Sequence, residues 1–424
     1  MRFGKISTPG TIIVNSTYHG NYSIWSIQAR WVFPVNEPPL PWGRITIQNE
    51  RILSVNSQPR GAADIVIDDC AIIPGLVNAH THLDLSGLRG TQAQPGEDFT
   101  QWLRSIIRHR RTLSTDQLAR DIQTGIHESL ACGTTMIGDI SANGLSWPIL
   151  TKAPLWSVVY YELLGLPRSR GGQVWQQARA WWDTRPETAT CRAGFSPHSP
   201  YGAGAALFRT VADFVGGSRT PVAIHLAETR EEMQLLRNHL GPFVDFLNEL
   251  GVWEEEELIS NPADLISLFS ENAITSFVHA NYLDPGNVPS GMASIIFCPR
   301  THAAFGHAPH PWREFLAKGV NVALGTDSPA SNPDLNVLAE ARFLHERHPE
   351  FSGAELLRMA TLAGARAMGW DDQAGSLAPQ KSADLVVLPV GLRPVEDPHL
   401  LLWDSAGPVR AVLCRGNWVI GEMR

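Results

Sequence analysis

"GLVNAHTHLDLS", residues 75–86, places two histidines at the end of an apolar run and just before a turn-prone segment. Alternate side chains of a β-strand point to one face, so His80 and His82 are expected to lie side by side. Imidazole is a common metal ligand. The stretch therefore suggests a metal site at the end of a strand, and it begins the pattern that decides the fold.

Short apolar strands alternate with longer helical segments from about residue 74 onward. Residues 99–132 and 230–252 are two such helical segments. Eight strands that alternate with helices predict an α/β fold, a (β/α)8 TIM barrel. The eight strands are expected at residues 76–82, 134–140, 155–164, 191–198, 221–227, 275–280, 294–299 and 320–326.

The two ends of the chain have a different pattern. Residues 22–73 consist of short alternating segments separated by turns, and strands return in "ADLVVLPV" and "VRAVLCRGNWVIGE" near the end. We expect both ends to meet in one small β-sandwich. The predicted domains are residues 1–73 plus 376–424 for the sandwich and residues 74–375 for the barrel.

Composition limits the partners and the compartment. A formal net charge of −8 argues against nucleic acid as the main partner. The first residues contain no apolar stretch long enough for a signal peptide or a membrane span, so a cytoplasmic location is expected. Five scattered cysteines are an odd number and lie mostly in apolar runs, which indicates reduced thiols. They are Cys70, Cys132, Cys191, Cys298 and Cys414.

Further potential metal ligands lie at the ends of other predicted strands. His225 and Glu228 end the fifth strand, His279 the sixth, and Asp327 the eighth. Taken singly, such a histidine is usually a core residue, and such an aspartate is usually a helix N-cap. All of them fall at the same end of the barrel, where burial without a shared function would be costly. A metal site is the better explanation.

The ligand types indicate the chemistry of this site. His80, His82, His225 and Asp327 would leave one position open for water, as in catalytic metal sites. Imidazoles with one carboxylate suit a single divalent ion, with zinc favoured and iron also compatible. Water on such an ion becomes a nucleophile near neutral pH. Glu228 is placed to take the proton of that water and pass it on.

The sequence resembles the amidohydrolase superfamily over essentially its whole length. The motifs that carry the resemblance are "PGLVNAHTHLD", "HLAET", "VHANYL", "LGTDS" and "KSADLVVL". The branch is similar to nucleoside and nucleobase deaminases and to triazine-ring hydrolases. The resemblance implies that His279 orients or activates the water beside Asp327. Family members with two metals usually carry a carboxylated lysine on the fourth strand, and "TCRAGFSPHSPYG" has none, which favours one metal.

The same resemblance suggests residues that bind a small-molecule substrate. His198 is similar to a purine-contacting histidine of thiomethyladenosine and adenosylhomocysteine deaminases, and Ser331 and Trp102 match other family positions. Thr100 departs from the pattern, because adenosine-type relatives have an acidic residue there that holds the ribose. Arg300 would suit an anionic tail, as in aminodeoxyfutalosine, an adenine nucleoside with a carboxylated aromatic tail. The role of the histidine-rich segment from His302 to His310 stays open.

We therefore expect a metal-dependent aminohydrolase that releases ammonia from a purine-like base or nucleoside. A triazine-type chlorohydrolase or another ring C–N hydrolase is the alternative within hydrolases. A non-catalytic scaffold with this fold is the alternative from another class, although it would not require the complete set of ligands. Homo-oligomers are common in the family, and the sequence leaves the oligomeric state open.

Overall fold

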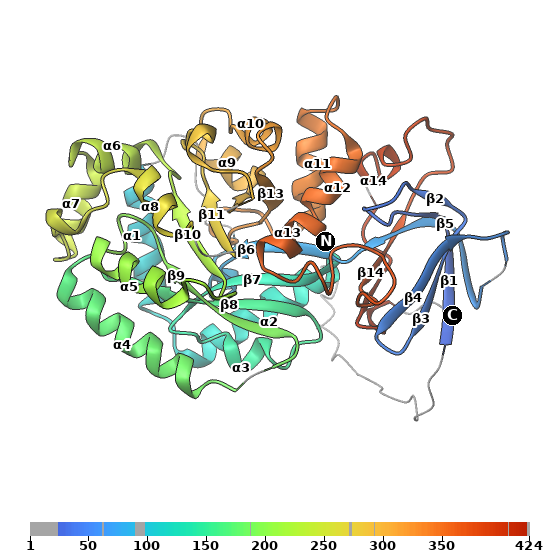
Figure 1. Cartoon of the computed structure of the whole chain (residues 1–424), viewed down its shortest axis with the longest axis horizontal. Coiled ribbons are helices and arrows are strands. Elements are labelled where there is room, and N and C mark those ends of the chain that lie inside the picture. The colour runs from blue at the N-terminus through green and yellow to red at the C-terminus, as the bar shows by residue number, and fades with distance from the viewer. Residues whose placement is uncertain are drawn as a thin grey trace, which may run out of the picture.

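The computed structural model describes residues 24–421 apart from residues 62, 90–97, 187, 271–273, 292 and 406. Figure 1 shows a barrel of strands and helices beside a smaller β-sheet that contains the first and last strands. The fold class predicted from the sequence, an α/β barrel with a small β domain, is confirmed.

The barrel consists of eight parallel strands that pair in chain order. Each strand is buried along nearly its whole length, as expected where helices cover a parallel sheet. An isolated bridge between Thr81 and Asp327 connects the last strand to the first. The strands are β6 (Leu76–Thr81), β7 (Thr134–Ala142), β8 (Trp156–Leu163), β9 (Cys191–Pro197), β10 (Val222–Leu226), β11 (Thr275–His279), β12 (Ser294–Phe297) and β13 (Asn321–Leu324).

Helices connect successive strands and surround them (Figure 1). They are α1 (Phe99–Arg110) and α2 (Thr115–Ala131), α3 (Trp147–Leu150), α4 (Arg168–Thr184), α5 (Ala205–Val215), α6 (Arg230–Asn238), α7 (Pro242–Glu249), α8 (Pro262–Leu268), α9 (Pro299–Phe305), α10 (Trp312–Ala317), α11 (Val337–Arg347), α12 (Gly353–Met359) and α13 (Leu362–Ala367). Three short 3-10 helices, η1 (Leu83–Leu88), η2 (Glu255–Glu257) and η3 (Pro285–Asn287), lie within these connections.

Two helical segments of the sequence each form two helices. Residues 99–132 divide into α1 and α2, because the Ser114 hydroxyl accepts from the amide of Gln117 and so caps a new helix. Residues 230–252 divide at His239, whose left-handed backbone (φ 54°) ends α6 before Pro242 begins α7. Helical periodicity does not predict these breaks, since the helices on both sides of each break have an apolar face.

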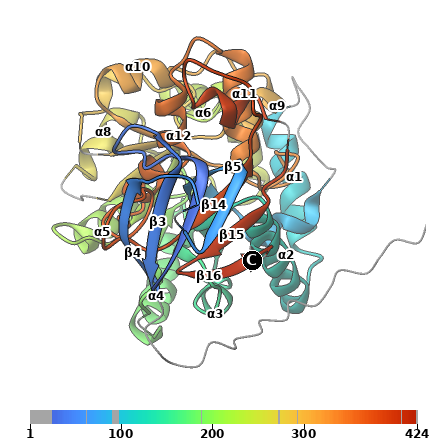
Figure 2. The same cartoon turned by 90° about the vertical axis from the view of Figure 1, so that its right-hand side faces the viewer.

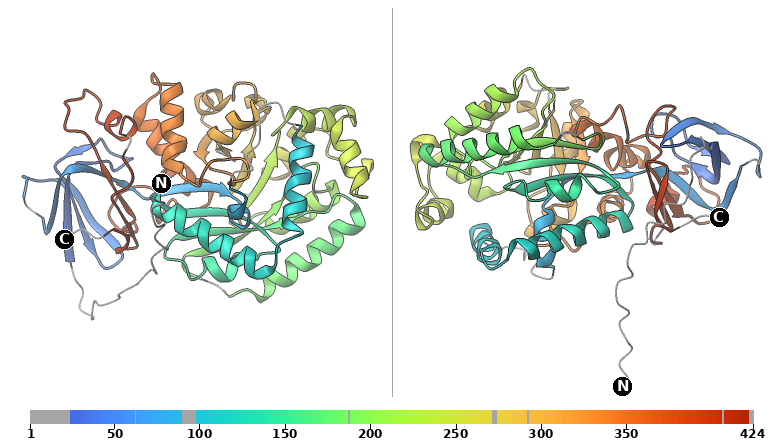
Figure 3. Two further views of the ribbon diagram at one scale, coloured as in Figure 1. Left: turned by 180° about the vertical axis from the view of Figure 1, so that it is seen from behind. Right: turned by 90° about the horizontal axis from the view of Figure 1, so that it is seen from below.

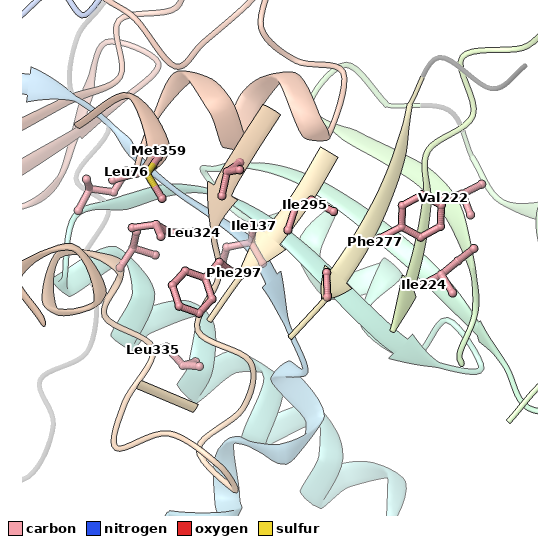
Figure 4. Packing of buried hydrophobic residues seen from close by; sticks show 14 of the residues in the cluster. Leu76, Ile137, Val222, Ile224, Phe277, Ile295, Phe297, Leu324, Leu335 and Met359 are labelled. Carbon is pink, nitrogen blue, oxygen red and sulfur yellow. The ribbon is translucent and has the colours of Figure 1, made fainter. Parts of the chain in front are cut away.

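The barrel core has an outer and an inner layer of apolar side chains. Figure 4 shows the outer layer, in which Leu76, Ile224, Phe277 and their neighbours lie on the strands together with Met359 from α12. Residues of opposite parity fill the interior, including Val77, Ala223, Val278, Ile296 and Ala323. Because the interior is filled by side chains, the open space of the barrel is confined to one end.

The smaller sheet joins strands from both ends of the chain, and Figure 2 shows it face-on. The strand order is β16-β15-β14-β5-β1-β3-β4, with β2 paired to β1. These strands also share an apolar core of their own. They are β1 (Ile24–Val32), β2 (Leu40–Pro41), β3 (Gly43–Gln48), β4 (Arg51–Ser57), β5 (Ile65–Pro74), β14 (Leu385–Pro389), β15 (Ala411–Cys414) and β16 (Asn417–Ile420); helix α14 (Leu400–Trp403) follows β14.

Figure 3 shows the same two parts from behind and from below, with the small sheet at one end of the molecule. The boundaries predicted for the two domains stay a prediction. The five cysteines are free thiols, four of them buried and Cys132 half-buried. Across the part of the chain that the structure describes, no helix is both long and apolar enough to cross a membrane.

Candidate active site

Six of the residues singled out from the sequence converge at the carboxyl ends of the barrel strands. His80 lies in β6 and His82 directly after it, His225 lies in β10 with Glu228 just beyond, His279 ends β11, and Asp327 follows β13. All six are buried, with exposed fractions of 6% or less. The predicted strand ends thus meet in space.

Irregular backbone conformations at the strand ends orient the side chains of these six residues. The pairing of β6 with β7 shifts register between Asn78 and Thr81, so simple alternation does not describe His80. His279 and Asp327 have left-handed backbones, with φ of 67° and 57°. Such conformations cost about 1–3 kcal/mol each and persist where the surrounding structure imposes them. The Thr81 hydroxyl donates to the Asp327 carbonyl at 2.6 Å, which fixes the junction between the first and last strands.

The ligand atoms form two overlapping groups, His80 with His82 and His225, and His80 with His279 and Asp327. Within each group the atoms lie within 4.8 Å of one another. The Nε2 atoms of His82 and His225 are 3.3 Å apart, and Asp327 Oδ1 lies 3.5 Å from His80 Nε2 and 3.7 Å from His82 Nε2. Because both groups include His80, a single cation can contact ligand atoms of both.

The buried groups fit one divalent cation. Both ring nitrogens of His80 are buried and lack a hydrogen-bond partner among the described residues. Burial, reinforced by the surrounding imidazoles, lowers the pKa of His225, so this ring is neutral and can act as a ligand. Burial alone would raise the pKa of Asp327, but the imidazoles of His80, His82 and His279 lower it overall, so the carboxylate is ionised. Neutral imidazoles with one carboxylate are a donor set for a metal such as zinc.

Several ligands are held by hydrogen bonds from behind. His225 Nδ1 is 3.0 Å from the His198 carbonyl oxygen, which leaves Nε2 directed at the cluster. The Ser331 hydroxyl donates to Asp327 Oδ2 at 2.5 Å. Such contacts orient metal ligands and increase their basicity.

The histidine-rich segment lies beside this centre. His310 Nε2 donates to the His279 carbonyl oxygen at 2.6 Å, and the His310 ring stacks on Phe297. His302 Nε2 bonds to the Ala308 carbonyl oxygen, so this ring stabilises its own loop. The segment therefore supports the backbone of His279 and adds no ligand to either group of ligand atoms.

Glu228 stands against His279 at the edge of the cluster. Its Oε1 lies 3.3 Å from His279 Nε2. Burial, followed by the charges of Asp327 and Glu232, raises the pKa of Glu228 well above its usual range. A carboxyl group in this environment can hold a proton near neutral pH, as a general acid must.

A cavity of about 330 Å³ opens from the cluster toward α1 and α7. His82, His225, Glu228, His279 and Asp327 lie in its wall. Most of the remaining wall is apolar, and the polar exceptions come from several elements: Arg110, Arg111, Glu162, Arg170, His198 and Ser328. The apolar and aromatic residues are Leu85, Phe99, Trp102, Leu103, Ile106, Ile107, Leu164, Leu166, Tyr201, Phe246, Leu247, Leu250 and Val252.

Two of the four residues predicted to bind substrate line this cavity. They are Trp102, whose Nε1 donates to the Ala330 carbonyl oxygen, and His198. Ser331 is fully buried behind Asp327, outside the cavity wall. Thr100, the departure from the family pattern, bonds to Asp98 and also lies outside the wall.

Arg300 also lies away from the cavity, so a substrate contact through this residue does not fit the structure. Its guanidinium forms ion pairs with Asp334 and Glu340. Glu340 is completely buried, and its charge needs this cation. The pairing explains why an arginine occurs next to a strand end, and it corrects the expectation that Arg300 receives an anionic tail.

Among the polar residues of the cavity wall that were not identified from the sequence, two contact each other, Glu162 and Arg110. Glu162 is near the carboxyl end of β8, and Arg110 is the last residue of α1. The rule that strand ends carry the active site could have found Glu162. Nothing in the helical pattern separates Arg110, which lines the cavity, from Arg108, which does not.

Comparison with known proteins agrees with this site. The profile of the Amidohydrolase family matches residues 71–419. An aminodeoxyfutalosine deaminase from Nitratiruptor sp. is 30% identical over 78% of this chain and 83% of the relative. A 5-methylthioadenosine/S-adenosylhomocysteine deaminase from Pyrococcus furiosus is 28% identical over 89% of this chain and 90% of the relative. Among solved structures, an adenosine deaminase from Xanthomonas campestris with bound zinc is 25% identical, with a TM-score of 0.73 and coverage of 93% and 92%.

The chain belongs to the amidohydrolase family, as its motifs indicated. It is a hydrolase that acts on carbon–nitrogen bonds, and its site holds a divalent metal.

Proposed function

We propose that this protein is a zinc-dependent deaminase of an adenosine-like nucleoside, with water replacing the exocyclic amino group. The observation that carries the proposal is the position of Glu228. It is a buried carboxyl group, held against His279, at the point where the ligand cluster meets the cavity. The relatives named above are deaminases of adenine nucleosides, which supports this reaction class.

His80, His82, His225 and Asp327 would hold the cation, and His279 completes the second group of ligand atoms. When bound, the cation supplies a water that loses a proton near neutral pH. Zinc is favoured over iron by the donor set and by the zinc in the structure from Xanthomonas campestris.

Residues of the chain carry out the proton transfers and orient the water. Glu228 takes one proton from the attacking water and delivers it to the ring nitrogen next to the reacting carbon; it then transfers the second proton, from the hydroxyl group formed on that carbon, to the departing amine. His279 and Asp327 orient the water. A carbon–oxygen bond forms, the carbon–nitrogen bond breaks, and ammonia leaves. The apolar wall excludes bulk water from these transfers.

The shape of the cavity favours a nucleoside with an apolar extension. Beyond the cluster, the wall includes Phe99, Trp102 and Phe246, and the exposed Arg111 and Arg170 contribute to the lining. Aminodeoxyfutalosine, with its carboxylated aromatic tail, would match an apolar channel with guanidinium groups in its wall. These arginines replace Arg300 as the groups that would receive the carboxylate.

An ammonia-release screen of the zinc-loaded protein tests this proposal. The amines are adenine, adenosine, guanine, cytosine, 5-methylthioadenosine and aminodeoxyfutalosine, and atrazine is included with chloride detection. We expect ammonia from the adenine nucleosides, with the highest kcat/KM for one that carries an apolar 5′ group. Chloride release without ammonia would show a chlorohydrolase, and no release from any compound would favour a scaffold.

The cytoplasmic location stays a prediction, and the oligomeric state stays open.

A further inference from the structure

Glu162 presents a carboxylate to the cavity beyond the metal ligands. The residue is buried, with an exposed fraction of 7%, yet its side chain contributes to the cavity wall. Its Oε2 accepts a hydrogen bond from Arg110 at the long distance of 3.4 Å. Its Oε1 lies 3.7 Å from His198 Nε2, beyond ordinary hydrogen-bond distance. A buried carboxylate with such incomplete bonding is costly unless another donor reaches it.

Arg110 contacts Glu162 and also contacts a second carboxyl group, that of Asp84. Its Nη2 lies 2.8 Å from Asp84 Oδ2, so the guanidinium is shared between two carboxylates. Burial alone would lower the pKa of Arg110, but Asp84 and Glu162 raise it overall, and the guanidinium stays charged. Because Arg110 divides its donors between two carboxyl groups, Glu162 keeps an acceptor position for a hydrogen-bond donor in the ligand.

The position of Glu162 relative to the cluster indicates which part of a ligand it reaches. The His198 ring stacks on the metal-ligand candidate His225, with ring centroids 4.3 Å apart. Glu162 is the next polar neighbour of His198, with Oε1 3.7 Å from His198 Nε2, and it lines the same cavity wall as His198 and His225. A purine whose reacting carbon meets the cluster would therefore extend past His198 and bring its sugar toward Glu162.

We propose that Glu162 is a specificity-determining residue that accepts a hydrogen bond from a ribose hydroxyl of the substrate. The inference rests on the proposed function, since it assumes a nucleoside with its base at the cluster. Arg110 is a positioning residue, which holds the carboxylate in a fixed orientation through its bond to Asp84.

Ligand pairs that differ in one hydroxyl test this assignment. Isothermal titration of the zinc-loaded protein would compare coformycin with 2′-deoxycoformycin, and inosine with 3′-deoxyinosine, reaction products that are not turned over. For at least one pair, we expect the wild type to bind the ribonucleoside about 10- to 100-fold more tightly, the range for a hydrogen bond to a charged group. In Glu162→Gln, a nearly isosteric variant, that ratio should fall to within about threefold of unity.

Asp84→Asn is the matched control. It removes the charge of Asp84 but keeps an oxygen that can accept from Arg110, at a side chain that does not line the cavity, so Arg110 stays in place and the ribose preference should persist. The assignment is overturned if Glu162→Gln keeps the wild-type ratios, or if Asp84→Asn loses the preference to the same extent. Metal content and circular dichroism of both variants establish that they are folded. If coformycin does not bind the wild type at all, the proposed function itself fails, which is a separate result.

Discussion

Glu228 and Glu232 are four residues apart in sequence and have different surroundings. Glu228 faces the cluster, whereas the Glu232 carboxylate accepts from the backbone amides of Ala227 and Glu228 at 2.9 and 2.7 Å. Glu232 thus holds the backbone that carries the proposed acid–base residue. The contacts of the single side chains thus distinguish Glu228, which is proposed to react, from Glu232, which positions it.

Changing Glu228 to Gln should abolish turnover and leave the metal content near one ion per chain. The amide keeps the size of the side chain but cannot accept and donate the proton, so kcat should fall by about 10² or more. Ammonia release and metal analysis of the purified variant check this. Loss of the metal together with activity would mean that Glu228 is a ligand.

The stability of the protein should depend on the titration of Glu232. Burial raises the pKa of this carboxyl group from 4.5 to about 7. Between these values the folded state binds a proton that the unfolded state has lost, so the free energy of unfolding falls as pH rises through this window. Glu232→Gln lacks this titration. Relative to the variant, the wild type should lose up to about 3 kcal/mol between pH 5 and pH 7.5.

Urea unfolding at several pH values measures this difference. Glu231→Gln, which removes a carboxyl group from the same helical turn, serves as the control. A wild type and a Glu232→Gln variant with parallel pH profiles would show that Glu232 titrates normally in the folded protein.

At the scale of elements, an ion-pair network joins helices α9 and α11 behind the eighth strand. Arg300 at the start of α9 contacts Glu340 in α11, and the Glu340 carboxylate also accepts from Asn332 at 2.7 Å. Asn332 in turn donates to the Thr326 carbonyl oxygen next to Asp327. The network supports the loop that carries Asp327, so Arg300 acts on the site through structure.

Replacing Arg300 with Met should destabilise the protein by about 3–5 kcal/mol, because it leaves the buried Glu340 unpaired. The KM of an active substrate should change by less than about twofold, since Arg300 is outside the cavity wall. Arg313→Met breaks an exposed pair with Glu350 and should change the melting temperature little. A large rise in KM with unchanged stability would restore the substrate role expected from the sequence.

At the scale of the whole molecule, one aspartate connects the barrel to the smaller sheet, which joins strands from both ends of the chain. Asp384, just before β14, accepts from Trp156 Nε1 in β8 at 2.8 Å and from the Arg415 amide at 2.9 Å. Its carbonyl oxygen accepts from the Gly75 amide at the entry to β6. The residue belongs to the "KSADLVVL" motif, and its contacts give that motif a structural role.

Asp384→Ala should lower the free energy of unfolding by about 2–4 kcal/mol, because a buried donor, Trp156 Nε1, and a part-buried one, the Arg415 amide, lose their acceptor. Chemical denaturation checks the magnitude, and Asp69→Ala, at an exposed carboxylate of the same smaller sheet, is the control. An equal effect of the two substitutions would show that Asp384 does not connect the two parts.

The sequence by itself predicted the order of the barrel strands, the meeting of the chain ends, and the residues that converge as candidate metal ligands. These depend on local periodicity and on the rule that parallel strands end on one side of a barrel. Tertiary structure alone decided that Arg300 pairs with Glu340, and that Arg110 lines the cavity beside Glu162. Which charges meet depends on how helices such as α1 and α11 pack over the strands, and neither period-2 nor period-3.6 patterns contain that information.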